Sequence, residues 1–232
     1  MRDQAIVAYF DARARRYDGR IKRFIGEREL RAVRSVVPEG TSVLDYGCGT
    51  GRTAIDLLSR GCRVTAYDPS RAMLGVAAER ARQLGHDAEF VSETGSLAGR
   101  VWPVVTCVGV LDYYPDPTTH LRGLMRYLAP GGRIVVSVPN AESPLGWLYA
   151  SRGLVAALPV TLRSARSLEQ AAVRAGLTAG VVRHAFPPVR WLALTVVASL
   201  ARESTPGADP RRSNLLRRRP VEIDAPTARA ME

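Results

Sequence analysis

Between residues 41 and 138, short apolar runs alternate with segments of helical periodicity, and this alternation constrains the fold more than any other feature. The apolar runs have the length of buried strands. Strands that alternate with helices form βαβ units, whose right-handed crossovers build a largely parallel sheet with helices on both faces. The predicted strands are residues 41–46, 62–67, 88–92, 103–108, 133–138, 178–184 and 192–201. The predicted helices after the first strand are residues 53–60, 70–84, 118–128 and 167–175.

The flanking segments complete one α/β domain over residues 1–202. Residues 1–37 have helical spacing and are predicted to form an N-terminal lid, with a break near Gly26. Residues 141–163 interrupt the alternation, and we interpret them as an insertion over the substrate side of the sheet. Residues 203–232 mix prolines with arginines and few large apolar residues, which predicts a disordered tail.

The chain has a net charge of +11, and basic residues concentrate in residues 13–34. Such a patch would attract nucleic acid or an acidic partner. The aromatic residues do not interleave with the arginines, so a solvated helix face is the favoured interpretation and nucleic acid is not an expected partner.

Targeting signals and disulfide patterns are missing from the sequence. No run of about 18 apolar residues predicts a membrane span, and the start of the chain has no apolar signal core. Cys48, Cys62 and Cys107 form neither a CxxC pair nor a cluster with histidine. These features predict a cytoplasmic protein without a structural metal site. The sequence does not predict an oligomeric state.

The loop after the first strand has glycine at every second position, at Gly47, Gly49 and Gly51. Glycines let the backbone turn sharply and approach a ligand closely, and the helix that follows presents free N–H groups. In an open α/β sheet, ligands bind at this carboxyl end of the strands. The loop therefore predicts a binding site, although a structural strand-to-helix turn is the alternative.

Two aspartates indicate what the loop binds. Asp45 precedes the first glycine, where a carboxylate would repel a pyrophosphate but would pair with an ammonium group. Asp68 ends the second strand, where a carboxylate can accept hydrogen bonds from ribose hydroxyls. A ligand with an ammonium group and an unphosphorylated ribose describes S-adenosylmethionine. The loop also lacks the GxGxxG spacing of nicotinamide-dependent dehydrogenases, which argues against that class.

These motifs resemble the class I S-adenosylmethionine-dependent methyltransferases, over about residues 4–201. The segments at residues 45–51, 68, 108–116 and 128–133 match the family's motifs in order and spacing. The resemblance implies a doubly wound, seven-stranded Rossmann-like sheet whose last strand is antiparallel. It also implies that Val108 and Gly109 lie beside the methionine end of the cofactor and that Met73 packs near the adenine.

The chain departs from the family pattern at two places. Members often carry an acid after strand three, near the adenine amine, and this chain has Thr94 at the expected position, directly after Glu93. Glu93 is the candidate substitute. Many members begin strand four with aspartate, and here Pro103 stands near that position, as suits the first residue of a strand.

The sequence defines the residues that act on the methyl acceptor less clearly than those that bind the cofactor. Asp112, Tyr113 and His184 are candidate general bases, while Tyr17, Tyr114 and Trp147 are candidate acceptor contacts. A base is needed only when the acceptor must lose a proton. His120 is expected to be a solvated residue on the outer face of its helix.

The resemblance and the short insertion favour a methyltransferase acting on oxygen, nitrogen or carbon of a small-molecule acceptor. The net charge motivates an RNA or protein methyltransferase as the alternative, and a non-catalytic cofactor-binding scaffold is a third possibility. The fold does not specify the acceptor.

Overall fold

A computed structural model describes residues 2–151, 160–185 and 192–202. Its centre is a seven-stranded sheet with strand order β3-β2-β1-β4-β5-β7-β6. β7 is antiparallel to both of its neighbours and the other pairs are parallel, which confirms the predicted fold class. The strands are β1 (Ser42–Tyr46), β2 (Arg63–Tyr67), β3 (Glu89–Val91), β4 (Trp102–Val108), β5 (Leu128–Pro139), β6 (Leu177–Ala185) and β7 (Thr195–Arg202).

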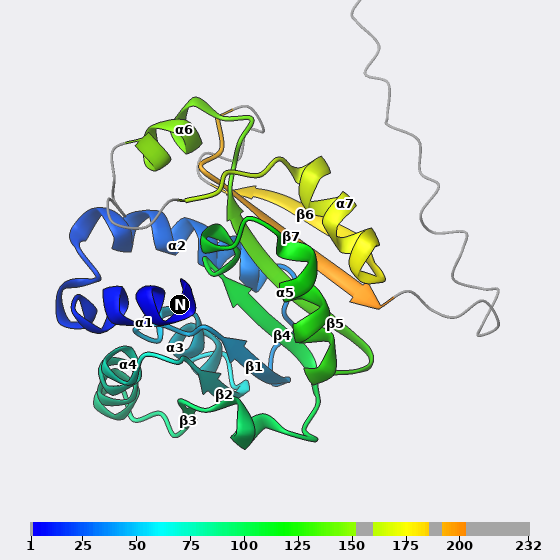
Figure 1. Ribbon diagram of the computed structural model, residues 1–232. Helices are drawn as coiled ribbons and strands as arrows, with labels where there is room; N and C mark the ends of the chain where they lie inside the picture. Colours follow the sequence, from blue (N-terminus) through cyan, green and yellow to red (C-terminus); the bar gives the residue numbers. More distant parts are fainter. Residues whose placement is uncertain (1, 152–159, 186–191, 203–232) are drawn as a thin grey trace, which may run out of the picture.

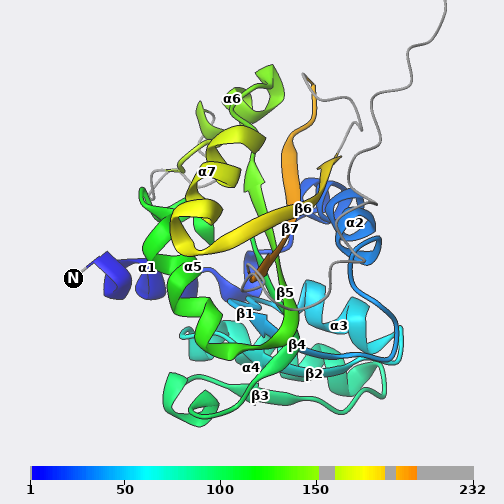
Figure 2. The ribbon, with the colours of Figure 1, turned by 90° about the vertical axis from the view of Figure 1, so that its right-hand side faces the viewer.

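Helices cover both faces of the sheet, with α5 and α7 on one side and α2 and α3 on the other (Figures 1 and 2). The two large clusters of buried side chains lie on opposite faces of the sheet, and a small third cluster contains Ile6 and Tyr113. Adjacent strand residues such as Val43 and Leu44 belong to different clusters because successive side chains in a strand point to opposite faces. The helices are α1 (Arg2–Asp11), α2 (Arg20–Arg34), α3 (Arg52–Leu58), α4 (Arg71–Gln83), α5 (Pro117–Leu124), α6 (Pro144–Ser151) and α7 (Ala165–Ala175).

The predicted break near Gly26 is wrong. Helix α2 continues through this residue, and the helical lid is interrupted instead between α1 and α2, where a short 3₁₀ helix spans Ala14–Arg16. Gly26 is buried, and a Cβ atom there would lie 1.9 Å from Nη1 of Arg52. The glycine provides space for a neighbouring side chain and does not bend the helix.

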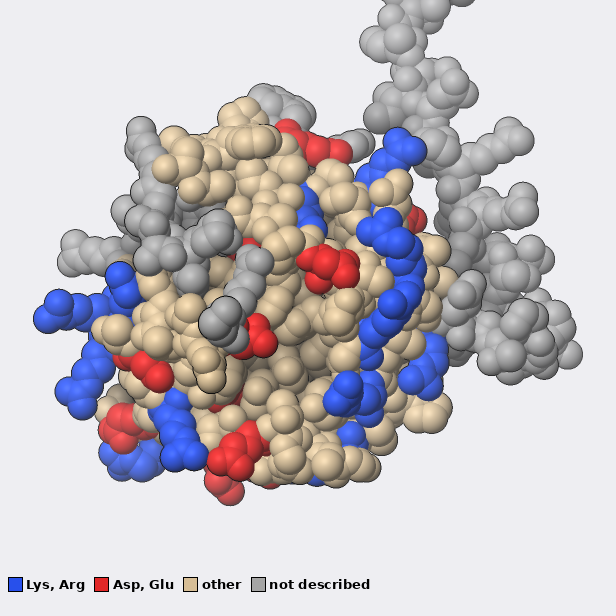
Figure 3. All heavy atoms as spheres, viewed as in Figure 1, with Lys and Arg blue, Asp and Glu red and all other residues tan. Residues whose placement is uncertain are grey.

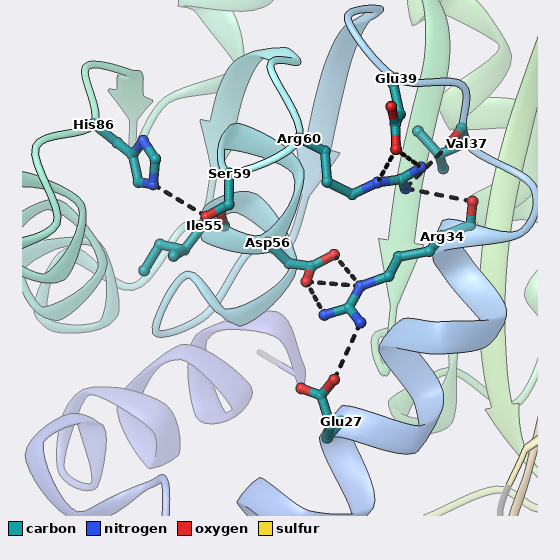
Figure 4. A network of polar contacts seen from close by, with 9 residues as sticks. All are labelled: Glu27, Arg34, Val37, Glu39, Ile55, Asp56, Ser59, Arg60 and His86. Carbon is teal, nitrogen blue, oxygen red and sulfur yellow. Dashed lines mark hydrogen bonds and ion pairs between the residues drawn. The ribbon is translucent and has the colours of Figure 1, made fainter.

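Helix α2 is held against α3 by ion pairs (Figure 4). Arg34 Nε donates to the two carboxylate oxygens of Asp56 at 2.9 and 3.0 Å, and Arg34 Nη1 donates to Glu27 at 3.1 Å. Just beyond α3, Arg60 donates to Glu39 at 3.2 Å and to the carbonyl of Arg34 at 3.3 Å. Since α3 begins at the glycine-rich loop, these contacts fix α2 relative to that loop.

Strand β5 begins earlier than expected, at Leu128, and α5 ends earlier, at Leu124. Leu128 pairs with Trp102, and the register shifts between Trp102 and Val104. Pro103 therefore lies at an irregularity inside β4, and not at the first residue of the strand as expected. This position suits a residue that has no N–H group to donate to the ladder.

The segment predicted as an insertion contains α6, and residues 152–159 of it lie outside the described residues. The predicted tail, residues 203–232, also lies outside them. Among the described helices, none has the length and apolar character needed to cross a membrane.

Candidate active site

A cavity of about 380 Å³ opens at the carboxyl ends of β1, β2 and β4. The glycine-rich loop and the end of β2 contribute part of its lining, and α1 and the segment after it contribute another part. The ends of β5 and β7 contribute through Pro139, Leu194 and Thr195. Segments far apart in the sequence therefore meet at the edge of the sheet where ligands of open α/β folds bind.

The three loop glycines have different structural roles, and all have positive φ angles. A Cβ atom at Gly47 would lie 2.4 Å from Cγ2 of Val110, and one at Gly51 would lie 2.8 Å from Cβ of Ala77. A Cβ atom at Gly49 would meet no other atom within 4 Å, and Gly49 lines the cavity. The loop thus leaves open space above residue 49, where a ligand can approach the backbone.

Asp68 lies at the end of β2 and lines the cavity. Its Oδ2 accepts a hydrogen bond from the Gly49 amide at 2.8 Å, and its Oδ1 accepts one from the Ser70 amide at 2.9 Å. Burial raises the pKa of the Asp68 carboxyl, although these two amides oppose the shift. Each carboxylate oxygen has two lone pairs, so each retains capacity for a ligand hydroxyl.

Asp45 is buried beneath the loop and is not among the residues that line the cavity. Thr106 Oγ1 donates to Asp45 Oδ1 at 2.7 Å, while Oδ2 has no hydrogen-bond partner among the described residues. Burial raises the pKa of this carboxyl to about 6. Any effect of Asp45 on a ligand must therefore act through the loop.

The other predicted cofactor residues divide into two groups. Met73, Val108 and Gly109 line the cavity, and the Gly109 amide donates to Ser137 Oγ at 2.9 Å. Glu93 and Thr94 are exposed and do not line it. Glu93 forms an ion pair with Arg71 at 3.2 Å on the surface.

The N-terminal segment is attached over the cavity at two carboxylates. Asp11 Oδ1 accepts hydrogen bonds from Ser70 Oγ at 2.5 Å and from the Ala72 amide at 3.2 Å. Asp18 accepts a hydrogen bond from Thr50 Oγ1 at 2.7 Å and forms an ion pair with Arg80. These contacts tie the segment to the beginning of α4 and to the glycine-rich loop.

Aromatic side chains fill the space between this segment and the loop after β4. The Phe10 ring packs edge-on against Tyr17 at 5.7 Å and against Tyr113 at 5.4 Å between ring centroids. Tyr17, Tyr113 and Tyr114 all line the cavity. Burial raises the pKa of the Tyr17 and Tyr114 hydroxyls to about 12 in each case, so both are neutral at physiological pH.

Asp112 is a buried carboxylate on the cavity wall. Its Oδ1 has no hydrogen-bond partner among the described residues. Burial raises the pKa of Asp112 well above its usual value, and the nearby Glu29 carboxylate adds to the shift while Arg163 opposes it. In its ionised form, this carboxylate therefore binds a proton more tightly than an exposed aspartate does.

Two predicted acceptor-side residues lie away from the cavity. His184 is on β6, the edge strand beyond β7, and is not part of the lining. Trp147 on α6 is 62% exposed and donates from Nε1 to the Ala141 carbonyl at 2.9 Å. The structure therefore does not bring either residue to the other site residues.

Sequence reasoning missed several cavity residues, including His120, Tyr46, Glu29 and Arg52. The expectation of a solvated His120 is wrong, because it is half-buried with its ring 4.3 Å from that of Tyr114. Burial lowers the pKa of this imidazole. One signal was available: His120 follows Pro117 by three residues and precedes Leu124 by four, the spacing of the buried face of α5.

Comparisons with known proteins agree with this geometry. A model of the methyltransferase domain matches residues 9–181. The ubiquinone biosynthesis O-methyltransferase of Pseudomonas entomophila is 32% identical over 161 residues, which cover 65% of this chain and 69% of the relative.

Solved structures share the fold at lower identity. The magnesium protoporphyrin IX methyltransferase of Synechocystis PCC 6803, with S-adenosylhomocysteine (SAH) bound, has a TM-score of 0.68 at 20% identity over 87% of this chain and 100% of its own. A possible histamine N-methyltransferase from Thermotoga maritima has a TM-score of 0.62 at 22% identity over 78% of this chain and 90% of its own. The chain belongs to the class I methyltransferase family, whose members use S-adenosylmethionine as the methyl donor.

Proposed function

We propose that this enzyme methylates a hydroxyl oxygen of a small-molecule acceptor, which binds in the same cavity as the cofactor. The observation that carries the proposal is Asp112, a buried carboxylate with an unpartnered oxygen on the cavity wall. The O-methyltransferase named above supports oxygen as the methylated atom. The size of the cavity supports a small acceptor.

The residues of the cofactor half fit S-adenosylmethionine. Gly49 leaves open space beside the loop, and Asp68 has the capacity to accept ribose hydroxyls. Met73, Val108 and Gly109 would surround the rest of the ligand. The cofactor supplies an electrophilic methyl group on a sulfonium, so the leaving thioether needs no proton.

The protein's contribution to the reaction is orientation and removal of one proton. The wall of Tyr17, Tyr113 and Tyr114 would position the acceptor, and α1 would exclude water above it. The bound cofactor would supply the methyl group to the acceptor oxygen, with its thioether as the leaving group. Asp112 takes the hydroxyl proton, and its raised pKa makes it a stronger base than an exposed aspartate.

Nucleic acid is not the proposed acceptor, because most of the positive charge lies elsewhere. Figure 3 shows a band of basic side chains on the side of α5 and α7. The exposed arginines there include Arg122, Arg126, Arg166 and Arg174, and none of them lines the cavity. We place the enzyme in the cytoplasm, and the free thiols of all three cysteines support a reducing compartment.

The test begins with calorimetric titration of SAH. Wild-type protein should bind, and Asp68→Asn should bind about 10- to 100-fold more weakly because hydrogen bonds to a charged acceptor are lost. Absence of binding to the wild type would contradict the proposal at its first step.

The second step measures transfer of a tritiated methyl group from S-adenosylmethionine to a panel of phenols and catechols, with transfer RNA as a parallel acceptor. We expect labelled methyl ethers, and Asp112→Asn should lower kcat while leaving SAH affinity within twofold. Label on RNA, or only on amines, would overturn the assignment of a hydroxyl acceptor.

A further inference from the structure

Arg52 is the one arginine or lysine among the described residues that line the cavity. Five acidic residues share the lining with it: Asp3, Asp18, Glu29, Asp68 and Asp112. This excess of acidic over basic residues in the cavity is unexpected in a chain with a net charge of +11. The position of the single guanidinium therefore restricts where a ligand carboxylate can bind.

Three features hold this guanidinium in place. Arg52 is the first residue of α3, directly after Gly51, and its side chain reaches across to α2. There it lies against Gly26, where even a Cβ atom would overlap it. Nη2 of Arg52 donates to Oε2 of the buried Glu29 at 2.6 Å.

The guanidinium retains donors for a ligand. Arginine carries five N–H donors, and among the described residues Arg52 donates one hydrogen bond, to Glu29. Burial opposes its charge, but the carboxylates of Glu29 and Asp18 together with Tyr17 keep its pKa above the usual value. A permanently charged, pre-positioned group of this kind suits a carboxylate, which it can bind through two parallel hydrogen bonds.

We propose that Arg52 binds the carboxylate of the cofactor's amino acid group, an inference that rests on the proposed placement of S-adenosylmethionine over the glycine-rich loop. The amino acid group carries one ammonium and one carboxylate. Asp45 lies beneath the loop at its start, and Arg52 lies at its end. Since Asp45 does not line the cavity, Arg52 is the one of these two residues that a ligand can contact directly.

The decisive experiment compares two ligands by calorimetry: SAH and its decarboxylated analogue S-adenosyl-3-thiopropylamine. Wild type should bind SAH about 10- to 100-fold more tightly than the analogue. The Arg52→Gln variant should bind the two ligands about equally. The substitution should weaken binding of SAH, which has the carboxylate, and leave binding of the analogue unchanged. Equal losses for both ligands, or no loss for SAH, would overturn the proposal.

Arg34→Gln is the matched control, since it removes another ion pair between α2 and α3 outside the cavity. It should retain the wild-type preference for SAH. If the wild type binds neither ligand, the proposed function itself fails. If the wild type binds SAH and Arg52→Gln keeps the preference, only the role of Arg52 fails.

A second variant tests the same point without changing any charge. Gly26→Ala places a methyl group where the guanidinium lies, so it should displace Arg52 and reduce the preference for SAH. Helix propensity favours alanine, so the variant is expected to fold. Gly75→Ala in α4 has open space around it and should leave both affinities unchanged. An unchanged preference in Gly26→Ala would contradict the proposal.

Discussion

Ser70 Oγ donates a hydrogen bond to Asp11 Oδ1 at 2.5 Å, which joins two residues 59 positions apart in the chain. Ser70 is also the N-cap of α4, where its Oγ accepts a hydrogen bond from the Met73 amide at 3.1 Å. One hydroxyl group therefore connects the N-terminal segment, the start of α4 and, through its neighbour Asp68, the predicted ribose site.

Loss of this connection should loosen the N-terminal segment. For Asp11→Ala we expect a decrease of about 1 kcal/mol in the free energy of unfolding, a typical cost of losing such a side-chain-to-backbone contact. SAH affinity should fall about fivefold, and amide exchange in residues 2–11 should accelerate. Glu79→Ala in α4 removes an exposed ion pair and should change none of these quantities appreciably. Unchanged exchange in Asp11→Ala would show that the contact does not hold the segment.

Substitutions at two glycines of the same loop should have opposite effects on stability and on ligand binding. Gly47→Ala combines a φ of 77° with a Cβ atom 2.4 Å from Val110, so it should destabilise the fold by about 2 to 4 kcal/mol. Gly49→Ala has free space, so it should cost only about 1 to 2 kcal/mol. Its methyl group would project into the cavity, however, and SAH binding should be lost. Urea unfolding and calorimetry measure both effects, and equal stabilities would refute the distinction.

Asp45 should make stability decrease as the pH rises. Its pKa is about 6 in the folded protein and 3.8 in the unfolded chain, so the folded state binds the proton more tightly between these values. The resulting stabilisation is fully present below pH 3.8 and is lost as the pH rises through 6. Asp45→Asn does not titrate, so it should gain about 2 kcal/mol relative to wild type between pH 4 and 7. Parallel stability curves for the two proteins would contradict this account.

Arg163 should stabilise the loop that carries Asp112. It is buried, and its Nη2 donates to the carbonyls of Tyr114 and Pro115, the latter at 3.1 Å. Arg163→Met leaves these groups without their donor and should cost about 2 to 4 kcal/mol, as measured by chemical denaturation. The exposed Arg166→Met is the control and should remain within about 0.5 kcal/mol of wild type. Similar values for the two variants would exclude this role.

The sequence was sufficient for features that depend on local pattern. The alternation of strands and helices predicted the sheet, because buried strands and amphipathic helices have distinct periods. The glycine spacing predicted the loop, since positive φ angles at Gly47, Gly49 and Gly51 are a local requirement. Asp68 was likewise placed at the cavity because the end of its strand is set by its own sequence.

Features that depend on packing between distant segments were not predictable. Gly26 was read as a helix break because a single sequence does not reveal that Arg52 needs the space. The spacing of His120 indicated the buried face of α5, but its ring partners Tyr46 and Tyr114 come from other segments and were not predictable. Glu93 was the candidate substitute for the missing family acid, yet it is exposed and pairs with Arg71.

The reversed direction of β7 has a consequence for how the enzyme can diversify. Thr195, the first residue of β7, pairs with Pro139, the last residue of β5, at the cavity edge. Neither residue takes part in the hydrogen bonds of Asp68, which come from Gly49 in the glycine-rich loop and from Ser70. Substitutions at the β5–β7 end would therefore reshape one side of the cavity without touching the glycine-rich loop and Asp68 on the other side.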